Sequence, residues 1–323
     1  MLALIVLLQS LTLVVSGPLT SSEYLPIRVA EAEGYFTREG LPLTVKTTRA
    51  ESGAAEALAQ GQADLAATTL EALLRFGPRQ SSQAPRLVFG LTAAPPVVLL
   101  VAAQHVDSVR SVEDLAGLRV GVTTPGAPEH AWLGWLLARR GVSVADVHVL
   151  SLGARGMAAS IGSGQLHAAL VPEPLASRLL AAGRAKLLAD FRTPQAVAQA
   201  LGRATVNAAF FVRADRRLRS QDLTALARAL LAAEERIRTG SADELAAKLG
   251  RRVTGTTEEF EALLETARVS YLGDGLVTAE EVRQTLAIVR AHTPLPASLR
   301  IPAPEEMLHL EPLRRALKAT AER

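Results

Sequence analysis

Hydroxyl side chains are concentrated in short segments that follow predicted strands. They are Ser21, Ser22, Thr68, Thr69, Thr123 and Thr124, and the turn residue Gly126 lies close to the last two. Hydroxyls and the free N–H groups at helix starts can bind an oxyanion without a counter-charge. The same residues could instead cap their own helices, which is the commoner use of Ser and Thr at such positions. The sequence therefore predicts a ligand site built from several loops, with helix capping as the alternative.

Two carboxylates and an imidazole are predicted near these loops. They are Glu23, His130 and Glu173, with Tyr24 directly after the first. A cleft lined in this way would suit a ligand with an amine or a nitrogen heterocycle, because carboxylates accept strong hydrogen bonds from such groups. Pro128 also lacks the N–H that an anion site would use. Each Glu could equally point to solvent or pair with a nearby Arg.

No catalytic or metal-binding pattern accompanies these residues. The six His have neither H-x-x-x-H nor H-E spacing, and the chain has no Cys, so thiolate metal sites and disulfides are excluded. A nucleophile elbow, a phosphate-binding loop and a dinucleotide fingerprint are also missing from the sequence. We predict a binding protein with no catalytic residue, no cofactor and no metal, although His130 and Glu173 facing each other could perform acid–base chemistry.

The elements that position these residues alternate between strand and helix over the first two thirds of the chain, which predicts an α/β fold with largely parallel sheets. One stretch occurs twice: residues 53–66 align without gaps on residues 156–169. Each copy is typical of a short helix, a Gly-Gln stop and an apolar strand, with the glycine ending the helix in a left-handed conformation. Two similar α/β units predict a cleft between two lobes, and therefore a ligand.

The predicted lobes are discontinuous in the sequence. Residues 11–103 and 205–293 are assigned to the first lobe, residues 104–204 to the second, and residues 294–323 to a C-terminal tail with a short helix. The apolar runs 97–103 and 208–212 are interpreted as the crossings between the lobes. Two crossings make a hinge, and such hinges close around ligands.

Within residues 1–10, the stretch Leu2–Leu8 is an unbroken apolar run that is too short to span a bilayer. We interpret it as the remnant of an export signal; the alternative is a first strand that runs on into 11–15. The chain of 323 residues is 49% hydrophobic and 21% charged, with a net charge of +3. Because no basic run is interleaved with aromatics, a nucleic-acid partner is not expected.

The chain resembles the periplasmic solute-binding proteins of ABC importers, in particular the nitrate/sulfonate/taurine branch. The resemblance is carried by residues 27–41, 57–66, 111–123, 125–126, 164–169 and 173–174. It implies a two-lobed type II fold, a periplasmic location and a monomer that delivers its solute to a permease in the inner membrane. The implied ligand is a small polar solute of the sulfonate, nitrate or taurine type, captured by hinge closure. The alternatives are a binder of a nitrogen heterocycle, such as a thiamine pyrimidine precursor, and a biosynthetic enzyme on the same fold.

Overall fold

Two five-stranded sheets organise the protein. The computed structural model describes residues 10–123, 129–216 and 218–321. Thr124, Gly126 and all but the last residue of the expected export signal lie outside these ranges. The first sheet has the order β2 (Leu43–Thr47), β1 (Leu11–Val15), β3 (Leu65–Thr69), β10 (Ala208–Arg213) and β4 (Pro85–Gly90). The second has the order β7 (His148–Ser151), β6 (Arg119–Val122), β8 (Ala168–Pro172), β5 (Val97–Ala102) and β9 (Ala185–Asp190).

The two sheets repeat one pattern. In each sheet four strands run in one direction, and only the fourth strand, which arrives from the other lobe, is antiparallel to its two neighbours. Strands β3 and β8 hold the same third position, and they are the strands of the repeated stretch. Gly61 and Gly164, at equivalent positions of the repeat, both have a φ of 72°. The duplication in the sequence therefore corresponds to a duplication in space.

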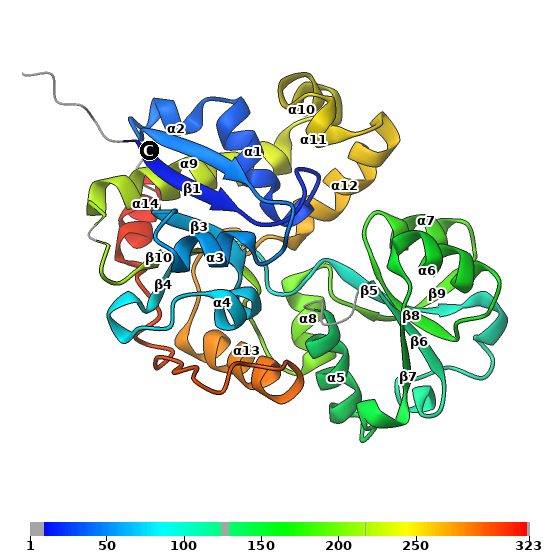
Figure 1. The fold of residues 1–323 in the computed structure, drawn as a ribbon. Coiled ribbons are helices and arrows are strands. Elements are labelled where there is room, and N and C mark those ends of the chain that lie inside the picture. The colour runs from blue at the N-terminus through cyan, green and yellow to red at the C-terminus, as the bar shows by residue number, and fades with distance from the viewer. Residues whose placement is uncertain (1–9, 124–128, 217, 322–323) are drawn as a thin grey trace, which may run out of the picture.

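Helices cover both sheets (Figure 1). The first lobe contains α1 (Leu25–Ala32), α2 (Tyr35–Arg38), α3 (Gly53–Ala59), α4 (Leu70–Phe76), α9 (Ser220–Thr239), α10 (Ala242–Leu249), α11 (Arg251–Thr254), α12 (Thr257–Ser270), α13 (Ala279–His292) and α14 (Glu311–Ala321). The second contains α5 (Glu129–Arg139), α6 (Gly153–Gly162), α7 (Leu175–Ala181) and α8 (Pro194–Leu201). None of the helices within the described ranges has the length and apolar character that a membrane crossing requires.

The predicted lobe boundary differs from the sheet pairing at one place. Strand β5 was expected at the end of the first lobe, but it pairs with β8 and β9 in the second sheet. The connection that leaves the first sheet is therefore the short segment 91–96, after β4. The return segment runs beside it, with Asn207 N–H donating to the Thr92 carbonyl (2.7 Å) and Thr205 Oγ1 donating to the Ala93 carbonyl (2.8 Å). The crossing is thus a paired, hydrogen-bonded connection.

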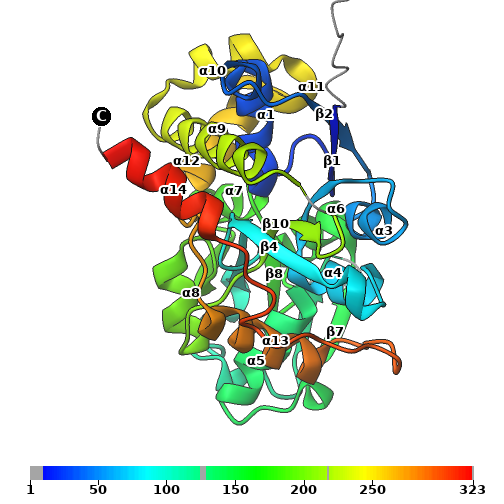
Figure 2. The same cartoon turned by 90° about the vertical axis from the view of Figure 1, so that its left-hand side faces the viewer.

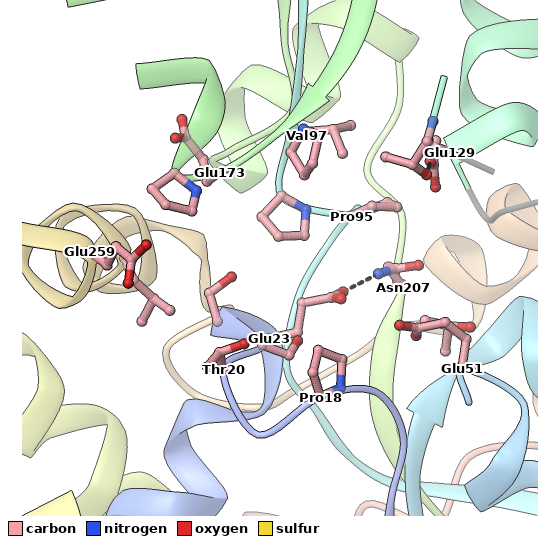
Figure 3. A pocket seen from close by; sticks show the side chains of 18 of the residues that line it. Pro18, Thr20, Glu23, Glu51, Pro95, Val97, Glu129, Glu173, Asn207 and Glu259 are labelled. Carbon is pink, nitrogen blue, oxygen red and sulfur yellow. Dashed lines mark hydrogen bonds between the residues drawn. The ribbon is translucent and has the colours of Figure 1, made fainter. Parts of the chain in front are cut away.

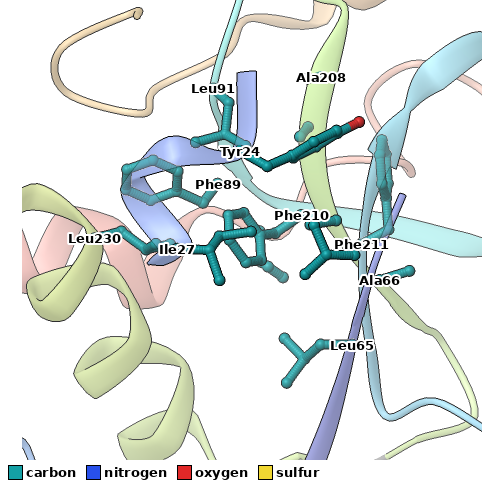
Figure 4. Close-up of a cluster of buried hydrophobic side chains, with 14 of the residues drawn as sticks. Tyr24, Ile27, Leu65, Ala66, Phe89, Leu91, Ala208, Phe210, Phe211 and Leu230 are labelled. Carbon is teal, nitrogen blue, oxygen red and sulfur yellow. The ribbon is translucent and has the colours of Figure 1, made fainter. Parts of the chain in front are cut away.

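Each lobe has its own apolar core. In the first lobe, Tyr24 and Phe211 are 1% and 0% exposed, and Phe89 packs edge-on against Phe210 with ring centroids 6.1 Å apart (Figure 4). Phe36 of α2 is also buried in this core, at 6% exposure. Strands of small and β-branched residues such as β3 fit between the helical layers, because both of their faces are buried.

The C-terminal tail is part of the first lobe. Helix α14 lies along α9 (Figure 2), and its Leu313 and Ala316 belong to the core of that lobe. Leu308 forms a bridge to Leu87 of β4, with the Leu87 N–H donating to the Met307 carbonyl. The short helix expected within the tail at 294–323 begins at Glu311, after the prolines of the tail.

Candidate functional site

A cavity of about 480 Å³ lies between the two lobes. Its lining comes from both sheets and from the segment that joins them (Figure 3). The lining residues are Pro18, Thr20, Ser21, Ser22, Glu23, Glu51, Thr69, Pro95, Pro96, Val97, Thr123, Glu129, Pro172, Glu173, Pro174, Asn207, Thr254, Gly255, Glu259 and Leu263. All four loops singled out in the sequence contribute, because the carboxyl ends of parallel strands open onto the same side of each sheet.

Glu23 is held in place by residues of the crossing. Its Oε1 accepts hydrogen bonds from Asn207 Nδ2 (2.6 Å) and Thr92 Oγ1 (3.4 Å). The short helix η1 (Ser22–Tyr24) that carries it is fixed by Tyr271, whose hydroxyl donates to the Ser22 carbonyl at 2.6 Å. Burial, followed by the nearby Glu51 carboxylate, raises the pKa of Glu23 to about 8. A neutral carboxyl group therefore predominates at neutral pH in the unliganded cavity.

Glu51 and Glu129 lie on opposite sides of the cleft. Glu129 is 6% exposed and begins α5 in the second lobe, where it accepts hydrogen bonds from the N–H and hydroxyl of Thr123. Glu51 precedes α3 in the first lobe, and its carboxylate has no hydrogen-bond or ion-pair partner among the described residues. Glu51 as a whole is solvent-exposed, but partial desolvation of its carboxylate in the cleft and, secondarily, the charge of Glu129 raise its pKa. The two carboxylates therefore repel each other across the cleft.

The other two carboxylates of the lining have cationic partners. Glu173, whose side chain is 2% exposed, forms an ion pair with Arg192 at 3.2 Å and accepts a hydrogen bond from Ser177 Oγ at 3.0 Å. Glu259 lies 3.7 Å from Arg178, an ion pair that joins α12 of the first lobe to α7 of the second. Pairing with Arg, the alternative considered for Glu173 in the sequence, is what the structure shows.

The charge of the cavity is one-sided. Its described lining contains five Glu but no Lys, Arg or His. Three of these Glu residues, at positions 23, 51 and 129, lack a cationic partner within the described part of the chain. The part of the chain described here also contains no group of three or more His, Asp or Glu positioned to hold a metal ion. The cavity is therefore suited to a ligand that donates hydrogen bonds or carries positive charge.

Several predicted site residues line this cavity and others do not. Ser21, Ser22, Glu23, Thr69, Thr123 and Glu173 line it. Thr69 also caps α4 by accepting from the Ala72 N–H at 3.1 Å, so its capping role is real. That these residues contact a ligand remains a prediction.

Three further residues lie elsewhere. Tyr24 is packed in the apolar core, and Thr68 is fully buried with its hydroxyl 3.0 Å from Ser16 Oγ. His130 lines a separate cavity between α5 and α13, together with His292. The remaining two, Thr124 and Gly126, fall outside the described residues.

Sequence reasoning missed Glu51, Glu129 and Asn207. The sequence analysis selected His130 and not its neighbour Glu129. Consecutive residues on a helix point about 100° apart, so these two side chains line different cavities. The available signal for Glu129 was its place in the first turn of a predicted helix, beside a strand end. Asn207 directly precedes β10, a position that becomes visible only once β10 is known to cross back beside β3.

The two-lobed architecture is that of the periplasmic binding proteins. A model of the NMT1-like family matches residues 13–250, about three quarters of the sequence, and the chain therefore belongs to this family. Comparison with curated proteins gave no match.

Solved structures share the fold at low sequence identity. The periplasmic aliphatic sulphonate binding protein SsuA of Escherichia coli is 17% identical with a TM-score of 0.69, over 87% of this chain and 91% of its own. The periplasmic nitrate-binding protein NrtA of Synechocystis is 14% identical with a TM-score of 0.66, over 96% and 88%. The desulfurization enzyme DszB is 17% identical with a TM-score of 0.61, over 96% and 99%. The fold thus occurs in binding proteins and in an enzyme.

Proposed function

We propose that this protein is the solute-binding component of an ABC importer. It captures a small solute in the interlobe cavity, closes by rotation about the paired crossing segments, and docks on a permease in the inner membrane. The observation that carries the proposal is a cavity shared by two lobes between which the chain crosses in short, paired segments. The fold it shares with the periplasmic binding proteins SsuA and NrtA supports the same role and a periplasmic location.

The charge of the cavity supports one of the two ligand classes expected from the sequence. A sulfonate or nitrate would be surrounded by Glu side chains, and the Thr123 donors that could have held it are already bound to Glu129. The cost of placing an anion beside unpaired carboxylates in a partly dehydrated cavity is high. We therefore propose a solute with a positively charged or hydrogen-bond-donating nitrogen, such as an amine or a basic heterocycle, in place of a bare anion such as a sulfonate or nitrate.

Binding without turnover is the second element of the proposal. The fold of DszB shows that an enzyme is possible on this scaffold, and the unpaired carboxylates of the cavity could exchange protons with a ligand. The cavity's described lining contains hydroxyls and carboxylates but neither the His nor the Lys that usually activates a Ser or Thr nucleophile. A solute recovered unchanged after prolonged incubation is the expected result, and its conversion would establish an enzyme.

Small-angle scattering tests the receptor proposal directly. Candidate amines, heterocycles, sulfonates and nitrate are first screened for those that raise the melting temperature of the protein. Each stabilising solute should then reduce the radius of gyration, because closure brings the lobes together. A solute that stabilises the protein without any compaction would contradict hinge capture.

A further inference from the structure

Three carboxylates meet at one end of the interlobe cavity and come from both lobes. Glu23 and Glu51 belong to the first lobe, and Glu129 is the first residue of α5 in the second. Figure 3 shows all three around Asn207, which binds Glu23 from the crossing segment. The group therefore straddles the surfaces that approach each other when the lobes rotate.

Two of these carboxyl groups are positioned by hydrogen bonds that bring no positive charge, and Glu51 has no partner among the described residues. Asn207 and Thr92 hold Glu23, and Thr123 holds Glu129, but neither an amide nor a hydroxyl brings a positive charge. Glu173 and Glu259, in the same cavity, each have an Arg. The contrast shows that the fold neutralises its other cavity carboxylates and leaves this group unpaired.

Electrostatics then couples this group to the movement of the lobes. Like charges repel more strongly as they approach and as water is expelled from between them. Desolvation is the main cause that raises the pKa of Glu23 and of Glu51, and the neighbouring carboxylates add a smaller contribution with the sign that repulsion between Glu51 and Glu129 requires. A cation between the lobes would convert this opposition into attraction.

We propose that Glu23, Glu51 and Glu129 form a cation site divided between the lobes, and that a positively charged organic group of the solute is the element that allows closure. This inference rests on the proposed solute-binding function and adds the charge of the solute and the reason that closure depends on it. An ammonium or amidinium group fits, because it presents several donors to carboxylates on different sides. A solute without positive charge would leave the repulsion between Glu51 and Glu129 in place.

Removal of one carboxylate from each side tests the divided site without a known solute. The variants are Glu129→Gln, Glu51→Gln and the double variant, with Glu113→Gln as control, since Glu113 is an exposed residue of the second lobe paired with Arg140. Glu51 has no described partner, so its replacement should leave folding intact even where Glu129→Gln does not. We expect both cavity variants to reduce the radius of gyration of the unliganded protein, and the control to leave it unchanged. In the double variant the decrease in the radius of gyration should be smaller than the sum of the two single decreases, because either replacement alone already removes the repulsion between Glu51 and Glu129.

Ligand measurements use agmatine, tetramethylammonium and 4-amino-2-methylpyrimidine as cationic or protonatable probes, with ethanesulfonate and nitrate as anions. At least one of the first three should bind the wild-type protein, and its affinity should fall by about tenfold or more in Glu129→Gln and in Glu51→Gln. The inference is overturned if anions bind more tightly than all three, or if unliganded dimensions and affinities are the same in these variants and the wild type. Failure of the proposed receptor function would give a different result. A bound probe would be chemically converted, while closure would still depend on Glu129.

Discussion

The pKa of Glu23 gives a quantitative prediction for stability. An isolated Glu titrates near 4.5, whereas in the folded protein burial and then Glu51 raise the value for Glu23 to about 8. Between these two values the folded state binds more protons than the unfolded state, so the free energy of unfolding falls as the pH rises. Each pH unit of difference is worth about 1.36 kcal/mol, so the full interval corresponds to about 5 kcal/mol as an upper bound. Water in the cavity screens the charge, and we expect about 2 kcal/mol to be measured.

The replacement Glu23→Gln should remove this contribution and little else. The amide oxygen of Gln can still accept from Asn207 and Thr92, as the protonated acid does at low pH. Glu51, Glu129 and Tyr24 remain as the titrating groups that face position 23. We therefore expect the variant and the wild type to have similar stability near pH 5.

Urea unfolding of both proteins from pH 5 to pH 9 provides the measurement. The variant should become progressively more stable than the wild type, with the gap opening between about pH 5 and pH 8. Because Glu71 and Glu234 also have raised pKa values, only the difference between the two curves reports on Glu23. Curves that stay parallel over this range would refute the argument that Glu23 is held in an unfavourable environment for its charge.

Three other replacements test parts of the structure. Arg192→Met should cost about 2 kcal/mol of unfolding free energy in chemical denaturation, because it leaves the Glu173 carboxylate buried without its counter-charge; no loss would mean that the pair is unimportant. Thr68→Val should cost about 1 kcal/mol by removing a buried hydrogen bond, with solute affinity changed less than twofold in calorimetry; a large affinity loss would place its hydroxyl on the ligand. Gly134→Ala should lower the melting temperature, although Ala normally stabilises a helix, because its Cβ would lie 2.5 Å from the His292 ring. A raised melting temperature would show that α5 and α13 do not pack so closely.

Local patterns predicted the repeated units and the loops around the cavity. The Gly-Gln turns at Gly61 and Gly164 require a left-handed residue, and their spacing from the following apolar strands placed β3 and β8 correctly. The four loops also followed from the sequence, since each begins where an apolar run ends. These features are determined by a few residues that are close together in the sequence, and local sequence patterns therefore predict them.

Long-range pairing was harder to predict. An apolar run such as 97–102 fits equally well in either sheet, and only its hydrogen bonds to β8 and β9 decide the matter. The neutral partners of Glu23 are distant in the sequence, with Asn207 separated from it by 184 positions. Helix α8 was missed although Thr193 and Pro194 provide a cap and a favourable first residue. The net charge of the cavity follows only from such assembled contacts.

Native mass spectrometry of the freshly purified protein tests the central claim most directly. A tightly bound solute survives purification in many receptors of high affinity and can be released and weighed. We expect a small, chemically unaltered molecule that carries an amine, amidine or basic ring nitrogen, and that is lost from the Glu129→Gln variant. Recovery of a sulfonate, of nitrate or of a reaction product would contradict the account of this cavity.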